Sequence, residues 1–382
     1  METLAQQINA LPEALLDELR THGFDPELLF RLASRMGEDA DFRNRLAGGV
    51  EPPLADDLVK LPATGTPEHD RLVERGMHSL SRGELAVVVL AGGMATRMGG
   101  VVKALVPAVQ GKTFLDLRLA ENRHWTRLAG KRVPLWLMTS YATDARLREA
   151  LGADLQADDM ATFQQNLSVR LSEDGHLFRE QDGKPSLYAP GHGDLPAALR
   201  RSGLLDRFSS RGGKYVSIAN IDNLGATIDP AILGWHIEHA DPVTVEVVDK
   251  LGSDKGGIPV RRNGRRLILE EFRLPHSFDP SKVRVFNTNT FLVTARALQD
   301  LEMEFTWVQV SKKVGDRKAV QFERLIGEIT STLATRFLHL PRLGAGSRFL
   351  PVKDMEELER RRPEIIEVAT ARGMLAQARD NA

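Results

Sequence analysis

The chain has 382 residues and not one cysteine. Disulfide bridges, thiolate metal sites and thiol nucleophiles are therefore excluded together. A chain without cysteine suits a reducing compartment, and we expect a cytoplasmic protein.

Long hydrophobic runs and a dominant charge are missing as well. The longest apolar run, residues 85–91, is the length of a strand and far short of the ~20 residues that span a bilayer. The amino-terminal stretch carries acidic residues and no basic leader before an apolar core, so it does not read as a secretory signal. The formal net charge is −1, which leaves no basic field to recruit nucleic acid. We expect neither a membrane nor a nucleic-acid partner, and anionic substrates must be held by local groups.

The residue pattern divides the chain into three parts. Residues 1–80 are expected to be a helical N-terminal segment and connection, in which Asp25 and Pro26 begin a helix. Prolines and glycines in 48–67 predict an irregular connection. Residues 81–345 are expected to form the main domain, and 346–382 a short C-terminal segment with a helix.

The main domain alternates apolar strands with helical patterns. Strands with nearly continuous apolar residues are buried on both faces, which predicts an α/β fold. We expect a mixed, mostly parallel sheet with helices on both faces. The expected strands are 85–90, 133–138, 215–219 and 243–248, and the helices include 113–128, 195–201 and 230–239. A hairpin is expected at 258–269, and apolar spacing predicts an amphipathic helix over 322–333.

A glycine-rich loop, AGGMATRMGG, follows the first of these strands directly. It places Gly92 and Gly93 at the carboxyl end of the strand, where open α/β sheets bind ligands. Glycine lets backbone N–H groups approach a phosphate or a base, and Arg97 and Lys103 could reach a polyphosphate. The spacing matches neither the dinucleotide fingerprint nor the P-loop. A tight turn with a solvated basic residue is the alternative.

Polar clusters follow further along the chain. Asp222 comes just after the strand at 215–219, and magnesium binds one or two carboxylates together with substrate phosphates. The alternative is an Asx turn. In PGHGD, two glycines flank His192, which is either a ligand or a surface-loop histidine, while Asp194 could cap the next helix. Asn287 and Asn289 offer two amides that suit sugar hydroxyls or a turn.

Ten blocks in order resemble the UDP-sugar pyrophosphorylase family, and within it the UTP–glucose-1-phosphate uridylyltransferases. The resemblance extends over about residues 85 to 355. The blocks are LAGGMATRMG with Lys103, MTS (138–140), FQQ (163–165), PGHGD (190–194), SGLLD (202–206), NIDNLGA (220–226), DKGG (254–257), LEE (269–271), FNTN (286–289) and SRFLPVK (347–353).

The resemblance implies a Rossmann-like nucleotidyltransferase core and a role for each matched residue. It implies transfer of UMP from UTP to glucose 1-phosphate, which gives UDP-glucose and pyrophosphate, with Mg²⁺ as cofactor. The implied nucleotide contacts are Leu90, Ala91, Gly92, Gly93, Gln165 and Gly191, of which Gln165 reads the uracil. The implied catalytic cations are Arg97, Lys103 and Lys353, and the implied metal ligand is Asp222. The implied sugar-phosphate contacts are His192, Asn220, Lys255, Glu270, Asn287 and Asn289, with Lys250 nearby.

Departures from the family pattern keep other functions open. Ala95 stands where the family has glycine, and Val101 and Val102 stand where it has Gly-Pro. The alternatives are a UDP-N-acetylglucosamine or broad-specificity pyrophosphorylase, and a protein that binds sugar nucleotides without catalysis. The oligomeric state is not indicated.

Overall fold

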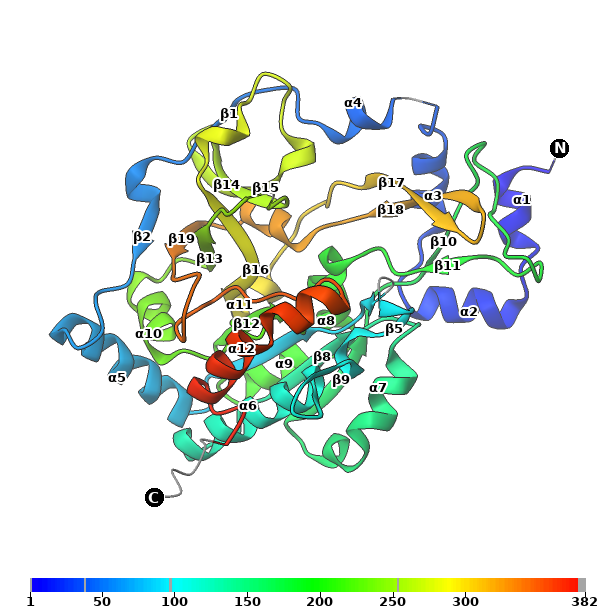
Figure 1. The fold of residues 1–382 in the computed structure, drawn as a ribbon. Coiled ribbons are helices and arrows are strands. Elements are labelled where there is room, and N and C mark those ends of the chain that lie inside the picture. The colour runs from blue at the N-terminus through cyan, green and yellow to red at the C-terminus, as the bar shows by residue number, and fades with distance from the viewer. Residues whose placement is uncertain (1, 38, 96–97, 253, 377–382) are drawn as a thin grey trace.

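The computed structural model describes residues 2–37, 39–95, 98–252 and 254–376, and its centre is an eight-stranded sheet (Figure 1). Neighbouring strands are parallel, except that β16 runs antiparallel to β12 and β13. The predicted mixed, mostly parallel sheet is confirmed. In spatial order the strands are β2 (Leu58–Lys60), β19 (Thr335–His339), β13 (Val243–Asp249), β16 (Val285–Thr294), β12 (Tyr215–Asn220), β3 (Leu85–Leu90), β8 (Leu135–Thr139) and β9 (Met160–Gln164).

Helices cover both faces of this sheet, as the apolar strands predict. In β3, Val88 packs with α8 and α9, whereas the next residue, Val89, packs on the opposite face with α6, α7 and α12. Side chains that alternate between two cores leave no polar face to the strand. These helices are α6 (Phe114–Ala129), α7 (Asp144–Leu151), α8 (Leu195–Arg201), α9 (Leu204–Ser210), α11 (Ala295–Gln299) and α12 (Met355–Ala371).

Two helices near the edge of the sheet approach at unusually short range. A Cβ on Gly76 of α5 (Pro67–Ser81) would lie 1.9 Å from the carbonyl oxygen of Pro230. A Cβ on Gly234 of α10 (Pro230–His239) would lie 1.9 Å from that of Leu72. Glycine is therefore required at both positions. No helix among the described residues is long and apolar enough to cross a membrane.

The N-terminal helices pack on the rest of the chain through an apolar cluster. Leu19 and Leu29 are buried there with Leu171 and Phe322. Figure 1 shows these helices beside β10, β11, β17 and β18, on the far side of the molecule from α5. The elements are α1 (Leu4–Asn9), α2 (Glu13–Thr21), α3 (Pro26–Ala33), β10 (Ser168–Val169), β11 (Leu187–Tyr188), β17 (Val308–Val314) and β18 (Arg317–Glu323).

Two sequence-based expectations about local structure are wrong. Residues 48–67 are not wholly irregular, since β1 (Val50–Glu51) pairs with β14 and β2 joins the central sheet. Residues 322–333 do not form an α-helix, because Phe322 belongs to β18 and Ile326–Ser331 is a short 3₁₀ helix. Phe322 packs under the N-terminal helices, while Ile326 and Ile329 pack in the main core. The helical spacing of these residues therefore arises from two separate cores and not from one helix face.

The predicted hairpin is confirmed. Strands β14 and β15 pair, and Asn263 and Gly264 take φ values of 51° and 76° at the turn between them. The remaining elements are α4 (Ala40–Asn44), β4 (Met94–Ala95), β5 (Val101–Val102), β6 (Pro107–Val109), β7 (Lys112–Thr113), β14 (Gly257–Arg262) and β15 (Arg265–Glu270).

Candidate active site

The carboxyl ends of four parallel strands meet at one edge of the sheet. Leu90 at the end of β3 pairs with Asn220 of β12 and Met138 of β8, and Thr139 pairs with Gln164 of β9. A cavity of about 340 Å³ opens at this edge. Its lining residues are Leu90, Gly92, Gly93, Lys103, Gln165, Ala189, Gly191, His192, Asn220, Ile221, Asp222 and Glu323. All of them except Ala189, Ile221 and Glu323 were predicted from the sequence.

Gly92 and Gln165 fit closely together on one wall of the cavity. A Cβ on Gly92 would lie 2.4 Å from Gln165 Nε2, so the glutamine amide takes the space that a side chain would need. Ser140 Oγ donates to the Gly92 carbonyl at 2.9 Å, and the Gln165 N–H donates to the Thr139 carbonyl at 2.9 Å. These bonds fix both residues to the sheet edge. The Gln165 amide can donate and accept hydrogen bonds, which suits one edge of a base.

The other residues of the glycine loop differ in how they face the cavity. A Cβ on Gly93 would meet no atom within 4 Å, so the backbone of Gly93 is accessible from the cavity. Ala91 does not line the cavity, because its side chain is buried in the core and its N–H donates to the Met138 carbonyl. Arg97 lies outside the described residues.

His192 is more buried than a surface-loop histidine. Its Nδ1 lies 2.9 Å from the N–H of Ile326 and accepts from it, so Nε2 carries the ring proton. Burial lowers the pKa of His192 to about 4, although nearby Glu323 opposes this shift. The ring is neutral at pH 7 and presents an N–H donor. Gly191 next to it has φ 106°, and a Cβ there would lie 2.9 Å from the carbonyl oxygen of Arg324.

The sequence suggested that the Asp194 side chain could cap α8. In the structure it makes no capping hydrogen bond. The carboxylate is fully buried and accepts from the N–H of Asn166 at 2.9 Å and from Arg324 Nε. The Asp194 carboxylate is thus buried within the wall of the cavity and does not face the cavity.

Asp222 and Lys103 form an ion pair within the cavity. Lys103 Nζ lies 2.5 Å from Asp222 Oδ2, and both residues line the cavity. Among the described residues there is no group of three or more His, Cys, Asp or Glu that could hold a metal ion. A cation here would have one protein carboxylate and would need oxygens from the substrate or from water. That donor set fits magnesium bound to a nucleotide.

The predicted amides meet at a bulge in β16. The pairing of β13 with β16 shifts between Glu246 and Val247, and Asn289 has φ 56°, a left-handed conformation that asparagine tolerates better than most residues. Asn289 Nδ2 donates to Asn220 Oδ1 at 3.0 Å, and the Asn289 N–H donates to Asn287 Oδ1 at 3.0 Å. The bulge therefore brings Asn289 to Asn220 at the end of β12, although neither Asn289 nor Asn287 lines the cavity itself.

Glu270 lies on the same side of the sheet as these amides. A Cβ on Gly257 would lie 3.1 Å from Glu270 Oε1 and 3.2 Å from Asn287 Nδ2, so both side chains border one small space. Burial, with repulsion from Glu271, raises the pKa of Glu270 to about 7. Lys250 pairs with Glu271 at 2.7 Å. Lys255 is exposed and does not line the cavity.

Lys353 is exposed and does not line the cavity, but its chain segment is anchored beside Asp222. Asn223 Oδ1 accepts from the Leu350 N–H at 2.8 Å, and Asn223 Nδ2 donates to the Arg348 carbonyl at 3.1 Å. Arg348 is buried and bonds both oxygens of Glu246, at 2.8 and 2.6 Å. The lysine thus extends from a rigid base, three residues beyond Leu350.

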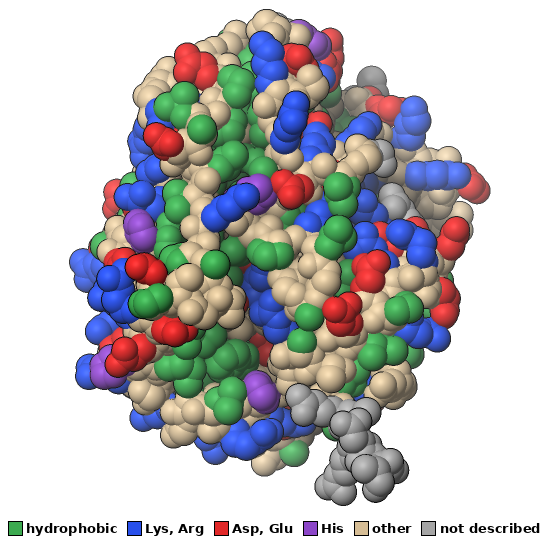
Figure 2. Space-filling view, turned by 60° about the vertical axis from the view of Figure 1, so that its left-hand side comes forward, with side chains coloured by type: hydrophobic (Ala, Val, Ile, Leu, Met, Phe, Trp, Pro, Cys, Tyr) green, Lys and Arg blue, Asp and Glu red, His purple; other side chains and the backbone are tan. Residues whose placement is uncertain are grey.

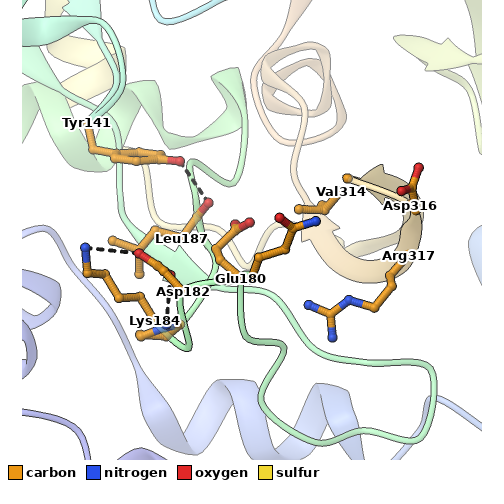
Figure 3. A pocket seen from close by; sticks show the side chains of 11 residues that line it. Tyr141, Glu180, Asp182, Lys184, Leu187, Val314, Asp316 and Arg317 are labelled. Atoms are coloured by element: carbon orange, nitrogen blue, oxygen red, sulfur yellow. Dashed lines mark hydrogen bonds and ion pairs between the residues drawn. The ribbon is translucent and has the colours of Figure 1, made fainter.

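A larger hollow, of about 740 Å³, contains none of the predicted residues (Figure 3). It lies between residues 180–187 and the turn that joins β17 to β18. The charges that line it are largely satisfied locally, for example by the ion pair of Lys184 with Asp182 at 3.1 Å. Figure 2 shows acidic and basic side chains interspersed over one face of the molecule, in keeping with the small net charge. We assign the site to the smaller cavity, where the polar groups converge.

Sequence comparisons place this arrangement in a known family. The family model for UTP–glucose-1-phosphate uridylyltransferase matches residues 50–380. The chain belongs to this family. A UTP–glucose-1-phosphate uridylyltransferase from Hordeum vulgare is 32% identical over 72% of the chain and 61% of the relative. One from Musa acuminata is 34% identical over 72% of the chain and 62% of the relative.

Solved structures agree with this assignment. A UDP-glucose phosphorylase from Trypanosoma brucei superposes with a TM-score of 0.74 and 25% identity, over 91% of the chain and 77% of that protein. The chain spans about three fifths of the length of the two curated relatives just described.

Proposed function

We propose that the chain transfers UMP from UTP to glucose 1-phosphate, giving UDP-glucose and pyrophosphate in a Mg²⁺-dependent reaction. The observation that supports this most directly is the single cavity in which Gly92, Gln165, Lys103 and Asp222 meet. The cavity combines the Gln165 amide, which could read a base, with the glycine backbone and with the ion pair of Asp222 and Lys103. The curated relatives carry the same activity in their names.

The reaction brings two polyanions together, so the protein must position them and offset their repulsion. The base would lie against the Gln165 amide and the backbone at Gly191. Lys103, which pairs with Asp222, would neutralise charge on the phosphates. Lys353, on a segment anchored to Asn223 beside Asp222, would supply a second cation to the phosphates. An oxygen of the sugar phosphate would attack the α-phosphorus of UTP while the bond to the leaving pyrophosphate breaks, so no covalent intermediate with the protein is needed.

Asp222 would hold the magnesium ion together with phosphate oxygens. When bound, such a cation neutralises charge on the phosphates and favours attack at phosphorus. The neutral ring of His192 would donate from Nε2, and Asn220 with Asn289 would present amides to the sugar phosphate. Glu270 and Asn287 border the space on the far side of the bulge, where sugar hydroxyls would lie.

The decisive experiment is a matrix of nucleotides and sugar 1-phosphates, assayed for pyrophosphate release with and without magnesium. We expect UTP with glucose 1-phosphate to be fastest and magnesium to be required. A higher rate with N-acetylglucosamine 1-phosphate would favour the alternative pyrophosphorylase. Binding of UDP-glucose by calorimetry without turnover of any pair would favour a non-catalytic binding protein.

Asp222→Asn and Asp249→Asn form a matched pair for the metal ligand. Asp249 is an exposed carboxylate at the end of β13, outside the cavity. We expect only the change at Asp222 to lower turnover and weaken the dependence on magnesium. Equal rates in the two variants would remove Asp222 from the reaction.

A further inference from the structure

Asp194 is a buried charge that the proposed reaction does not use. Its exposed fraction is 0%, yet its carboxylate accepts from the Asn166 N–H at 2.9 Å and from Arg324 Nε. Buried ion pairs contribute little net stability, because desolvation offsets most of the attraction. A carboxylate kept in such a place is better explained by the geometry that it imposes than by stability.

The two donors belong to two different walls of the cavity. Asn166 directly follows Gln165, and Arg324 directly follows Glu323, both of which line the cavity. Asp194 itself follows Gly191 and His192, which form a third wall. One carboxylate thus joins three segments that are far apart in the sequence.

The backbone around this carboxylate is locked as well. The Gly193 N–H donates to the Arg324 carbonyl at 3.0 Å, and the Arg324 N–H donates to the Pro190 carbonyl at 2.9 Å. A Cβ on Gly193 would lie 2.5 Å from the carbonyl carbon of Arg324, so the two segments touch directly. These bonds fix Asp194 relative to Arg324. The Asp194 carboxylate adds the bond from these two segments to the Asn166 N–H, next to Gln165.

Arg324 and Asn166 are themselves held in place by their surroundings. The Arg324 guanidinium lies over the Trp307 ring at 4.7 Å from its centroid. Asn166 Oδ1 accepts from Arg201 Nη1 at 3.0 Å, and Asn166 Nδ2 donates to the Gly23 carbonyl at 3.2 Å. The side chain of Asn166 is thus bonded to α8 and to the turn after α2, while its backbone N–H is bonded to Asp194.

We propose that Asp194 is a positioning residue for nucleotide selection, which holds the Gln165 amide in place through the backbone of Asn166. The proposal rests on the proposed function, since it takes Gln165 to be the group that reads uracil. Asparagine at this position would keep one acceptor oxygen, so the Asn166 N–H and Arg324 Nε could no longer both be bonded, and the wall that carries Gln165 would lose its side-chain link to the wall that carries Glu323.

The test compares Asp194→Asn with Asp57→Asn. Asp57 is also buried, with an exposed fraction of 2%, and it also accepts from one arginine, Arg261, and one backbone N–H, that of Leu54. It does not line the cavity. Both variants remove a buried carboxylate that pairs with an arginine and accepts from a backbone N–H, and only Asp194 is joined to a residue next to Gln165.

Two readouts are measured on the full chain. The first is the ratio of Kd values for UTP and CTP, determined by calorimetry. The second is hydrogen exchange of residues 163–168 in the nucleotide-free protein. We expect Asp194→Asn to reduce the preference for UTP about tenfold or more and to speed exchange in this segment, because a displacement of ~1 Å can cost two orders of magnitude. Asp57→Asn should leave both at the wild-type level.

A folded Asp194→Asn protein with wild-type preference and wild-type exchange would overturn the proposal. If that variant does not fold, Asp194→Glu decides by the same readouts, because it keeps the charge but displaces both carboxylate oxygens from the Asn166 N–H and from Arg324 Nε. A wild-type protein that prefers UTP but releases no pyrophosphate with any sugar phosphate would contradict the proposed function and leave this inference standing. Normal turnover of the wild-type protein, together with a wild-type preference for UTP in the two variants that disturb Asp194, would contradict this inference and leave the proposed function standing.

Discussion

Gly92→Ala should damage nucleotide binding and leave the fold intact. The added Cβ would lie 2.4 Å from Gln165 Nε2, whereas ordinary contacts begin at 3.4 Å. The amide must therefore retreat by about 1 Å. Gly92 does not have a positive φ, so alanine fits its backbone, and Ser140 can keep its bond to the carbonyl. The only group that has to move is the Gln165 amide, to which we assign the reading of the base.

The size of the effect follows from this displacement. A reading group misplaced by ~1 Å costs about a hundredfold in binding or rate, or roughly 3 kcal/mol. Stability should change by less than about 1 kcal/mol, because replacing glycine by alanine at a compatible position restricts the unfolded chain. We therefore expect the Kd and the KM for UTP to rise about a hundredfold, with Tm nearly unchanged.

Calorimetry with UTP, a pyrophosphate-release assay and thermal melting would measure these three quantities. The control is Gly37→Ala, because a Cβ on Gly37 would meet no atom within 4 Å and its φ is not positive. A Gly92→Ala protein that binds UTP like the wild type would refute the assignment of Gln165 to the base. A large fall in Tm would instead show that Gly92 supports the fold.

Three other predictions concern charged groups. Lys353→Ala should lower turnover about a hundredfold with no change in Tm, since the side chain is exposed and acts only on phosphates; unchanged turnover in the release assay would remove it from the reaction. Arg348→Met should destabilise the protein by about 3 kcal/mol in urea unfolding, because it leaves Glu246 buried without its partner, whereas a smaller loss is expected when Glu246 is also replaced by Gln. The raised pKa of Glu270, about 7 against 4.5, means that the folded state holds more protons between these values, so stability should fall as pH rises from 5 to 8. Glu270→Gln should remove up to about 3 kcal/mol of that fall, and equal pH profiles of the two proteins would contradict the prediction.

Much of the site was predictable because it lies at strand ends. The apolar runs that end at Leu90 and near Asn220 locate the edge of the sheet, and the polar residues that follow must gather there. Family resemblance added Gln165, whose strand is only partly apolar. These predictions depend on short-range patterns, which a single sequence displays directly.

The residues that were missed depend on partners far away in the chain. Glu323 was overlooked because Phe322 and Ile326 mimic helical spacing, although they pack in separate cores. Asp194 and Arg324 are 130 residues apart, and only the fold brings them together. The bulge at Asn289 could not be predicted from the sequence either, since asparagine also suits an ordinary turn.

The polarity of the strands explains why the two sides of the cavity edge are built differently. Strand β16 is antiparallel to β12, so the bulge near its start, rather than its end, lies beside the carboxyl end of β12. Asn220 and Asn289 therefore meet at the boundary between two kinds of strand. On one side, parallel strands end in loops rich in glycine, which leave backbone open to a nucleotide. On the other side, Asn289 and Asn287 belong to a strand that continues into the sheet, so the side that we propose for the sugar would offer amides on a strand instead of loops.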